Sequence, residues 1–88
     1  MDAAFFLVSG KVQGVGFRAG ARHSALGLGL SGYVHNRPDG KVEVFVQGTA
    51  QAIDAFARWV GQGPPLAKVE NVSRQRAQPR EMQGFGMG

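Results

Sequence analysis

A glycine-rich stretch near the N-terminus constrains most strongly how this 88-residue chain can fold. It reads Gly-Lys-Val-Gln-Gly-Val-Gly-Phe-Arg over residues 10–18, between an apolar run at residues 5–8 and an alanine-rich segment at residues 19–25. This succession predicts a strand, a tight loop and the first turn of a helix. Because loop N–H groups and the positive end of a helix can converge on one point, the stretch predicts an anion-binding site.

Arg18 lies where this loop meets the predicted helix. Its planar guanidinium offers a fork of donors that matches the oxygens of a phosphate or a carboxylate. Two familiar phosphate-binding patterns do not fit. The chain is short for the βαβ domain that carries GxGxxG, and no Gly-Lys-Ser/Thr follows the loop. A glycine-rich turn with a solvated arginine would use the same residues, so the loop by itself leaves both interpretations open.

Hydrophobic periodicity and turn residues predict six main elements in the order βαββαβ. They are strands at residues 4–11, 32–37, 41–47 and 67–76, and helices at residues 18–26 and 50–61. A last strand at residues 84–87 has weak propensity because glycine alternates through it. The order predicts an α+β fold, the ferredoxin-like sandwich, with an antiparallel sheet and two helices on one face. The length fits a single domain over residues 1–88.

The third and fourth strands carry two distinctive patterns. Val42, Val44 and Val46 alternate along the third strand, so they share one face, and we expect the helices to cover it. Val69 and Val72 do not share one alternating face, which predicts a bulge in the fourth strand.

The helices carry their own boundary signals. Thr49 suits the N-cap of the second helix. Gly27 and Gly29 both suit the left-handed residue that ends the first helix. His23 lies off the buried stripe of that helix, so we expect it to be exposed.

The composition excludes several kinds of protein. The chain has no cysteine and only two histidines, far apart, which argues against a disulfide or a structural zinc site and agrees with a reducing cytoplasm. Its longest apolar stretch is too short to cross a membrane, and the N-terminus lacks the pattern of a secretory signal. We therefore expect a cytoplasmic protein with no metal and no membrane partner.

The formal net charge of +4 favours anionic partners, either nucleic acid or a small phosphorylated molecule. Much of this charge lies in Lys68, Arg74, Arg76 and Arg80, where a solvated edge strand protected by charge is an adequate explanation. An RNA-recognition domain has the same element order, but its aromatic consensus is absent and the third strand offers only Phe45 for base stacking. We therefore expect no nucleic-acid partner.

Two motifs resemble those of the acylphosphatase family. Val-Gln-Gly-Val-Gly-Phe-Arg at residues 12–18 is similar to the family's signature loop, and residues 28–36 resemble its second motif. Pro-Asp-Gly-Lys-Val-Glu at residues 38–43 follows at the expected spacing, and the likeness extends from about residue 5 to residue 72. The resemblance implies the ferredoxin-like fold and hydrolysis of acyl phosphates to a carboxylate and inorganic phosphate. It also implies that no metal or organic cofactor takes part.

The resemblance assigns roles to particular residues. Arg18 and Asn36 would be catalytic, with Arg18 holding the phosphoryl oxygens and Asn36 orienting the attacking water. The phosphate-binding loop would comprise Gln13, Gly14, Val15, Gly16, Phe17 and Arg18. From the residues alone, a turn residue before Pro38-Asp39-Gly40 is the better explanation of Asn36, and only the resemblance favours catalysis.

Two alternatives keep the same loop. A regulatory module of this fold would bind phosphate or a carboxylate without turnover, and an acylphosphatase-like domain could belong to a larger maturation enzyme. We favour a free-standing enzyme that acts as a monomer on a small acyl phosphate. Its two catalytic residues would face one anion if the first and second strands are adjacent, because their ends would then be neighbours.

Overall fold

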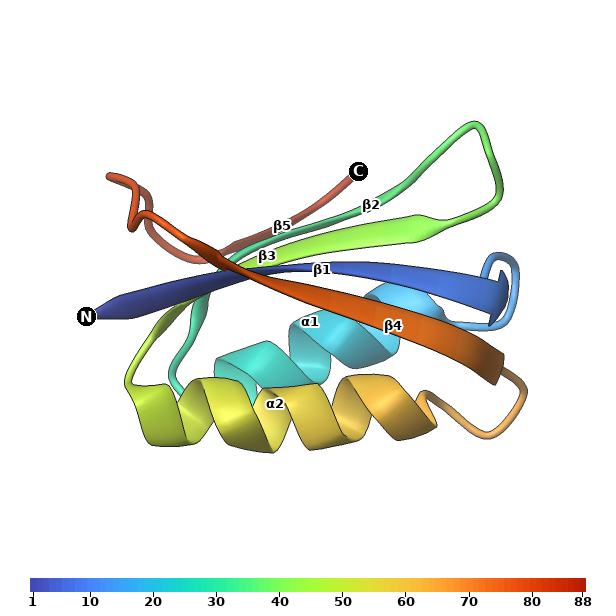
Figure 1. Cartoon of the computed structure of the whole chain (residues 1–88), viewed down its shortest axis with the longest axis horizontal. Coiled ribbons are helices and arrows are strands. Elements are labelled where there is room, and N and C mark those ends of the chain that lie inside the picture. The colour runs from blue at the N-terminus through green and yellow to red at the C-terminus, as the bar shows by residue number, and fades with distance from the viewer.

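The computed structural model describes all 88 residues and consists of one sheet with two helices on one of its faces (Figure 1). The helices are α1 (Phe17–Gly27) and α2 (Ala50–Gln62), and they pack side by side. The sheet has the order β4-β1-β3-β2-β5. Its strands are β1 (Asp2–Lys11), β2 (Ser31–Asn36), β3 (Val42–Gly48), β4 (Lys68–Ala77) and β5 (Phe85–Met87). This is the predicted ferredoxin-like α+β sandwich.

The core lies between the sheet and the helices. Val42, Val44 and Val46 of β3 are fully buried in it, which confirms the predicted inward face of that strand. The stripe of α2 buries Ile53, Phe56 and Val60 against the same core. Thr49 caps α2 as predicted, since its side chain accepts a hydrogen bond of 3.1 Å from the N–H of Ala52. Neither helix is long and apolar enough to span a membrane.

β4 is an edge strand that contains the predicted bulge. The register with β1 shifts between Ser9 and Gly10, where β4 inserts Glu70 as an extra residue. The extra residue shifts the alternation of side chains along β4, so that Val69 and Val72 both pack against the core.

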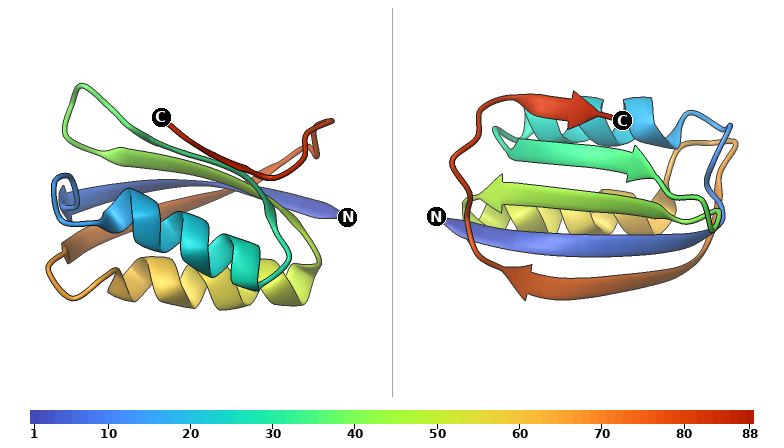
Figure 2. Two further views of the ribbon diagram at one scale, coloured as in Figure 1. Left: turned by 180° about the vertical axis from the view of Figure 1, so that it is seen from behind. Right: turned by 90° about the horizontal axis from the view of Figure 1, so that it is seen from above.

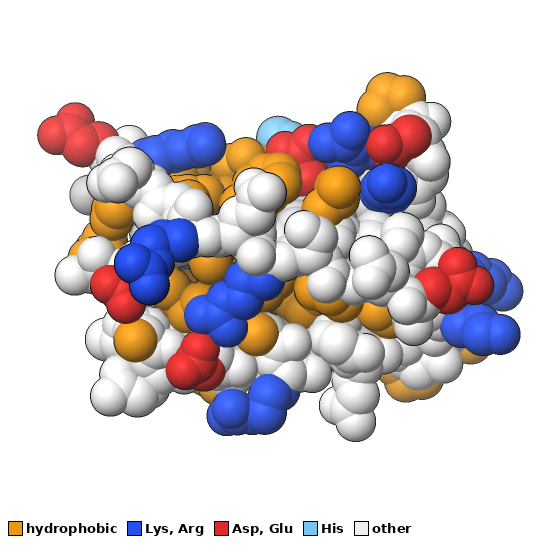
Figure 3. Space-filling view, viewed as in Figure 1, with side chains coloured by type: hydrophobic (Ala, Val, Ile, Leu, Met, Phe, Trp, Pro, Cys, Tyr) orange, Lys and Arg blue, Asp and Glu red, His pale blue; other side chains and the backbone are white.

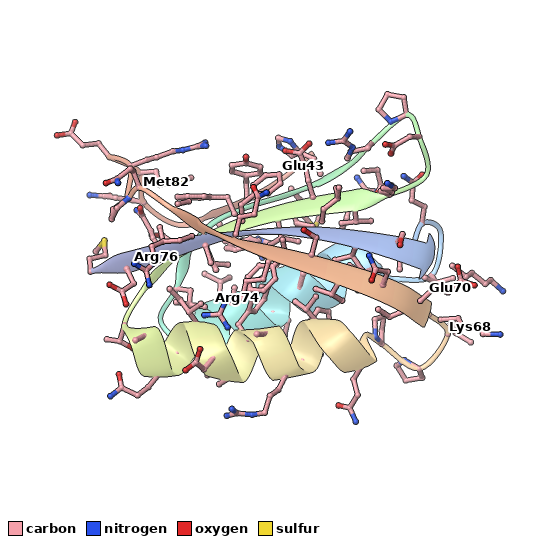
Figure 4. The ribbon with its side chains drawn as sticks, viewed as in Figure 1. Glu43, Lys68, Glu70, Arg74, Arg76 and Met82 are labelled. Carbon is pink, nitrogen blue, oxygen red and sulfur yellow. The ribbon has the colours of Figure 1, made fainter.

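The basic side chains of β4 lie along an exposed edge. Figure 4 shows Arg74 reaching from β4 toward α2, where it contacts Asp54 at 3.0 Å, whereas Lys68 and Glu70 project from the far end of the strand. Lysine and arginine side chains are interspersed with acidic ones over this face (Figure 3). The arrangement agrees with a charged, solvated edge.

The predicted antiparallel sheet is confirmed for every strand pair except the last. β5 pairs with β2 in parallel, with Phe85 opposite Gly32, so the sheet is antiparallel except at this edge. The cause is the connection over residues 78–84, which crosses the end of the sheet where β2 begins (Figure 2). β5 therefore starts at the same end as β2 and runs in the same direction.

At the end of α1, one of the two glycines predicted to end the helix does so. Gly29 has φ 75° and is the left-handed residue, whereas Gly27 lies inside the helix. The N–H of Leu30 donates to the carbonyl of Ala25 at 2.9 Å, and the N–H of Gly29 donates to that of Leu26 at 3.1 Å. These two bonds form a Schellman motif, which requires only one left-handed residue.

Candidate active site

The loop between β1 and α1 turns on two left-handed glycines. Gly14 has φ 74° and Gly16, the N-cap of α1, has φ 81°. A Cβ at either position would meet no atom within 4 Å, so the backbone conformation rather than crowding favours glycine there. Phe17 is the first residue of α1, and its buried ring packs on Trp59 of α2 with the ring centroids 5.2 Å apart. This contact anchors the loop to the second helix.

The loop presents backbone N–H groups that have no partner within the protein. None of the N–H groups of residues 14–19 donates a hydrogen bond, and the first such bond in α1 runs from the N–H of Gly20 to the carbonyl of Gly16 at 3.0 Å. They lie at the positive end of α1, whose first turn contains no acidic residue. This arrangement can bind the oxygens of an anion.

Gln13 connects the loop by hydrogen bonds to the hairpin between β2 and β3. Its Nε2 donates to the carbonyl oxygens of Arg37 at 2.8 Å and Lys41 at 2.9 Å. These two residues also bond to each other at the base of the turn, where the N–H of Arg37 donates to Lys41 at 2.8 Å. The sequence placed Gln13 in the phosphate-binding loop but gave no signal of this contact.

Asn36 is the last residue of β2 and lies against the loop. It lines a cavity of about 150 Å³ together with Gly14, Gly16 and Arg18. Its side-chain oxygen, Oδ1, is buried and accepts no hydrogen bond. An unpartnered acceptor of this kind costs about 1–3 kcal/mol, so it requires an explanation other than turn formation.

The arrangement of strands that brings Arg18 and Asn36 to one cavity differs from the predicted one. β3 lies between β1 and β2, so the two strands are not adjacent. The loop instead passes the start of β3, where Gln13 contacts Lys41, and so reaches the end of β2. The two side chains come together although the expected strand pairing is absent.

Arg18 is half-buried and is held by the C-terminal segment of the described chain. Its Nη1 donates to the backbone oxygen of Gly88 at 2.5 Å. The N–H of Gly88 in turn donates to the carbonyl of Val34 at 2.9 Å, which ties this segment to β2. Sequence analysis missed this contact, because a weak glycine-containing strand gives no sign of a functional neighbour.

The carboxylates of Asp39 and Glu43, in and beside the hairpin, do not line the cavity. The backbone N–H of Lys41 donates to Asp39 at 3.1 Å and, with the adjacent Arg37, holds the pKa of that carboxyl below its usual value. Arg37 contacts Asp39 at 3.2 Å and Glu43 at 3.7 Å. Arg37 is therefore neutralised locally, and Arg18 is the cation of the cavity.

The fold and this cavity define a small α+β protein with a site that can hold an anion. Residues 4–87 match the family model described as acylphosphatase. An acylphosphatase from Thermus thermophilus is 51% identical over 79 residues, 90% of each chain, and one from Xanthomonas euvesicatoria is 53% identical over 74 residues, 84% of each chain. The crystal structure of acylphosphatase from Bacillus subtilis superposes with a TM-score of 0.95 at 35% identity, covering 100% of this chain and 99% of that one.

The chain therefore belongs to the acylphosphatase family. It is a hydrolase that splits acyl phosphates into a carboxylate and inorganic phosphate. This outcome confirms the predicted activity over the alternative of a binding module without turnover.

Proposed function

We propose that residues 13–18 bind the phosphoryl group of the acyl phosphate and that Arg18 holds its oxygens. The unpartnered N–H groups of the loop and the guanidinium of Arg18 supply fixed donors around one small cavity. Phosphoryl transfer depends mainly on positioning and on stabilising charge at the phosphoryl oxygens, and such donors do both.

Asn36 orients the attacking water in this proposal. An amide oxygen can accept a hydrogen bond from water, and the amide nitrogen can donate one, without any change of charge. Two observations carry the proposal: Asn36 lines the same cavity as Arg18, and its side-chain oxygen has no hydrogen-bond partner within the protein.

The reaction needs no strong acid or base from the protein. The water oxygen bonds to phosphorus, and the bond between phosphorus and the carboxylate oxygen breaks as the carboxylate leaves with its electron pair. Because an amide is a poor base, the proton of the water passes to a phosphoryl oxygen of the substrate. The chain supplies orientation and electrostatic stabilisation.

The setting of the reaction is part of the same proposal. The 88 residues form a single domain that acts as a monomer in the cytoplasm on small acyl phosphates, without a cofactor and without nucleic acid or membrane as partner. The cytoplasmic location is supported by the lack of cysteine.

The two roles can be separated by kinetics with benzoyl phosphate in the presence of a metal chelator. We expect Arg18→Ala to lower kcat/KM at least about 100-fold and to weaken competitive inhibition by inorganic phosphate. Asn36→Ala should lower kcat by a similar factor of about 100 while the inhibition constant for phosphate stays near that of wild type. Arg58→Ala and Asn71→Ala change exposed residues of α2 and β4 and are the matched controls.

Loss of phosphate binding in Asn36→Ala with normal turnover would refute the role given to Asn36. Turnover that survives in Arg18→Ala would refute the role given to Arg18.

A further inference from the structure

A larger groove lies next to the smaller cavity, along α1 and β5. It has a volume of about 560 Å³ and is lined by Ala19, Arg22, His23, Leu26, Gly27 and Met87. Ala19 and Met87 also line the smaller cavity. The two spaces therefore meet between α1 and β5, which run beside each other (Figure 2). We call the six-residue space the acyl groove.

We propose that the acyl groove binds the acyl part of the substrate and favours acyl groups that carry a second anionic group. The inference rests on the proposed function, because the phosphoryl group must occupy the smaller cavity for the acyl part to enter the groove. It assigns Arg22 and His23 as specificity-determining residues.

The spacing of the groove residues matches the reach of a short acyl group. Ala19, Arg22, His23 and Leu26 are separated by three, four and seven positions and form one stripe of α1. At about 1.5 Å per residue, Arg22 lies about 4.5 Å and Leu26 about 10 Å along the helix from Ala19. An acyl group that leaves the cavity past Ala19 therefore meets Arg22 and His23 within the length of one aromatic ring.

The walls of the groove are apolar in part. Leu26 is 43% exposed and Met87 is 51% exposed, although both are large hydrophobic residues. Leu26 comes from α1 and Met87 from β5. An acyl chain or ring placed between them would remove apolar surface from water.

The polar groups of the groove are suited to an anion. The Nε of Arg22 donates to the carbonyl of Phe85 at 3.1 Å, which fixes the side chain beside β5. Its two terminal nitrogens bond to no other residue, and neither does the ring of His23. No carboxylate lines either cavity, and α1 contains none. A terminal carboxylate or phosphate on the acyl group would meet a cation with free donors.

The test compares benzoyl phosphate with its 3-carboxy and 4-carboxy derivatives in wild type and in Arg22→Gln. Glutamine keeps a donor for the Phe85 carbonyl but removes the charge. The quantity measured is the ratio of kcat/KM for a carboxylated substrate to that for benzoyl phosphate. Comparing this ratio between variants cancels the intrinsic reactivity of each substrate.

We expect Arg22→Gln to lower the ratio for at least one carboxylated substrate by about three- to tenfold, as for the loss of a partly exposed charged contact. Arg58→Gln on α2 makes the same change in net charge and should leave the ratio unchanged. Arg22→Glu should shift the preference from 4-carboxybenzoyl phosphate toward 4-(trimethylammonio)benzoyl phosphate.

Equal ratios in wild type and Arg22→Gln, or an equal fall in Arg58→Gln, would overturn the inference and leave the proposed function intact. Failure of the proposed function has a different signature. Arg18→Ala would then hydrolyse benzoyl phosphate as fast as wild type, and both proposals would fall.

Discussion

At the scale of single residues, the buried oxygen of Asn36 connects structure with chemistry. A residue that only shapes a turn satisfies its side-chain groups within that turn, whereas Asn36 leaves Oδ1 without a donor. Such an atom is a cost to the folded state that is retained for another reason.

This cost predicts how Asn36→Ala affects stability. Because the substitution removes an unsatisfied buried acceptor, we expect the free energy of unfolding to stay within about 0.5 kcal/mol of wild type or to rise by about 1 kcal/mol. Denaturant unfolding followed by circular dichroism measures it. A loss of more than about 1 kcal/mol would mean that Asn36 serves chiefly as a turn residue.

The lowered pKa of Asp39 predicts that the stability of the protein depends on pH. Its pKa is lowered from 3.8, first by the backbone N–H of Lys41, so the ionised form is favoured in the folded state. The contribution of Asp39 to stability is therefore fully present above pH 3.8 and is lost as the pH falls through the lower folded-state pKa.

We expect Asp39→Asn to lower the thermal midpoint at neutral pH, with a difference from wild type that shrinks as the pH falls below 3.8. Thermal unfolding at a series of pH values measures this difference. Glu81→Gln removes an exposed carboxyl that makes no hydrogen bond and is the control. A difference that grew toward acid pH would contradict the direction of the pKa shift.

At the scale of helices and strands, the prediction from sequence succeeded where long periodic patterns repeat. The valine face of β3 and the buried stripe of α2 follow from alternation and helical spacing. The direction of β5 could not be predicted, because three residues carry too little pattern to fix a pairing.

In the candidate active site too, sequence patterns predict the local motifs but not the contacts between distant segments. The loop and Asn36 are recognisable as motifs, but the contact of Gln13 with the hairpin and that of Arg18 with Gly88 depend on how distant segments meet. Local sequence carries no record of such pairings.

Replacing two glycines of these elements by alanine should change the free energy of unfolding in opposite directions. Gly32 of β2 has φ 155°, and a Cβ there would lie 1.8 Å from the backbone oxygen of Phe45, so β2 and β3 would have to separate. We expect Gly32→Ala to lower the free energy of unfolding by more than about 2 kcal/mol. Gly61 lies in α2 with nothing within 4 Å, so Gly61→Ala should raise it by about 0.5–1 kcal/mol.

Chemical denaturation of both variants measures these values. Equal effects of the two substitutions would contradict the close approach of β2 and β3 at Gly32.

At the scale of the whole molecule, the net charge of +4 and the acid-free α1 predict attraction of anionic substrates. We expect kcat/KM for benzoyl phosphate to fall several-fold, roughly three- to tenfold, between low salt and 0.5 M salt, because screening shortens the reach of the charges. Steady-state kinetics should show the effect mainly in KM. A kcat/KM that did not change with ionic strength would contradict this account of substrate attraction.

The central claim is that the backbone N–H groups after β1 bind the phosphoryl group. It is tested most directly by following the backbone amide resonances of ¹⁵N-labelled protein during titration with inorganic phosphate. The account predicts that the largest shifts fall on residues 14–19, with the side-chain amide of Asn36 following at the same phosphate concentration. Largest shifts along β4, around Arg74 and Arg76, would place the anion at the charged edge and would contradict the assigned site.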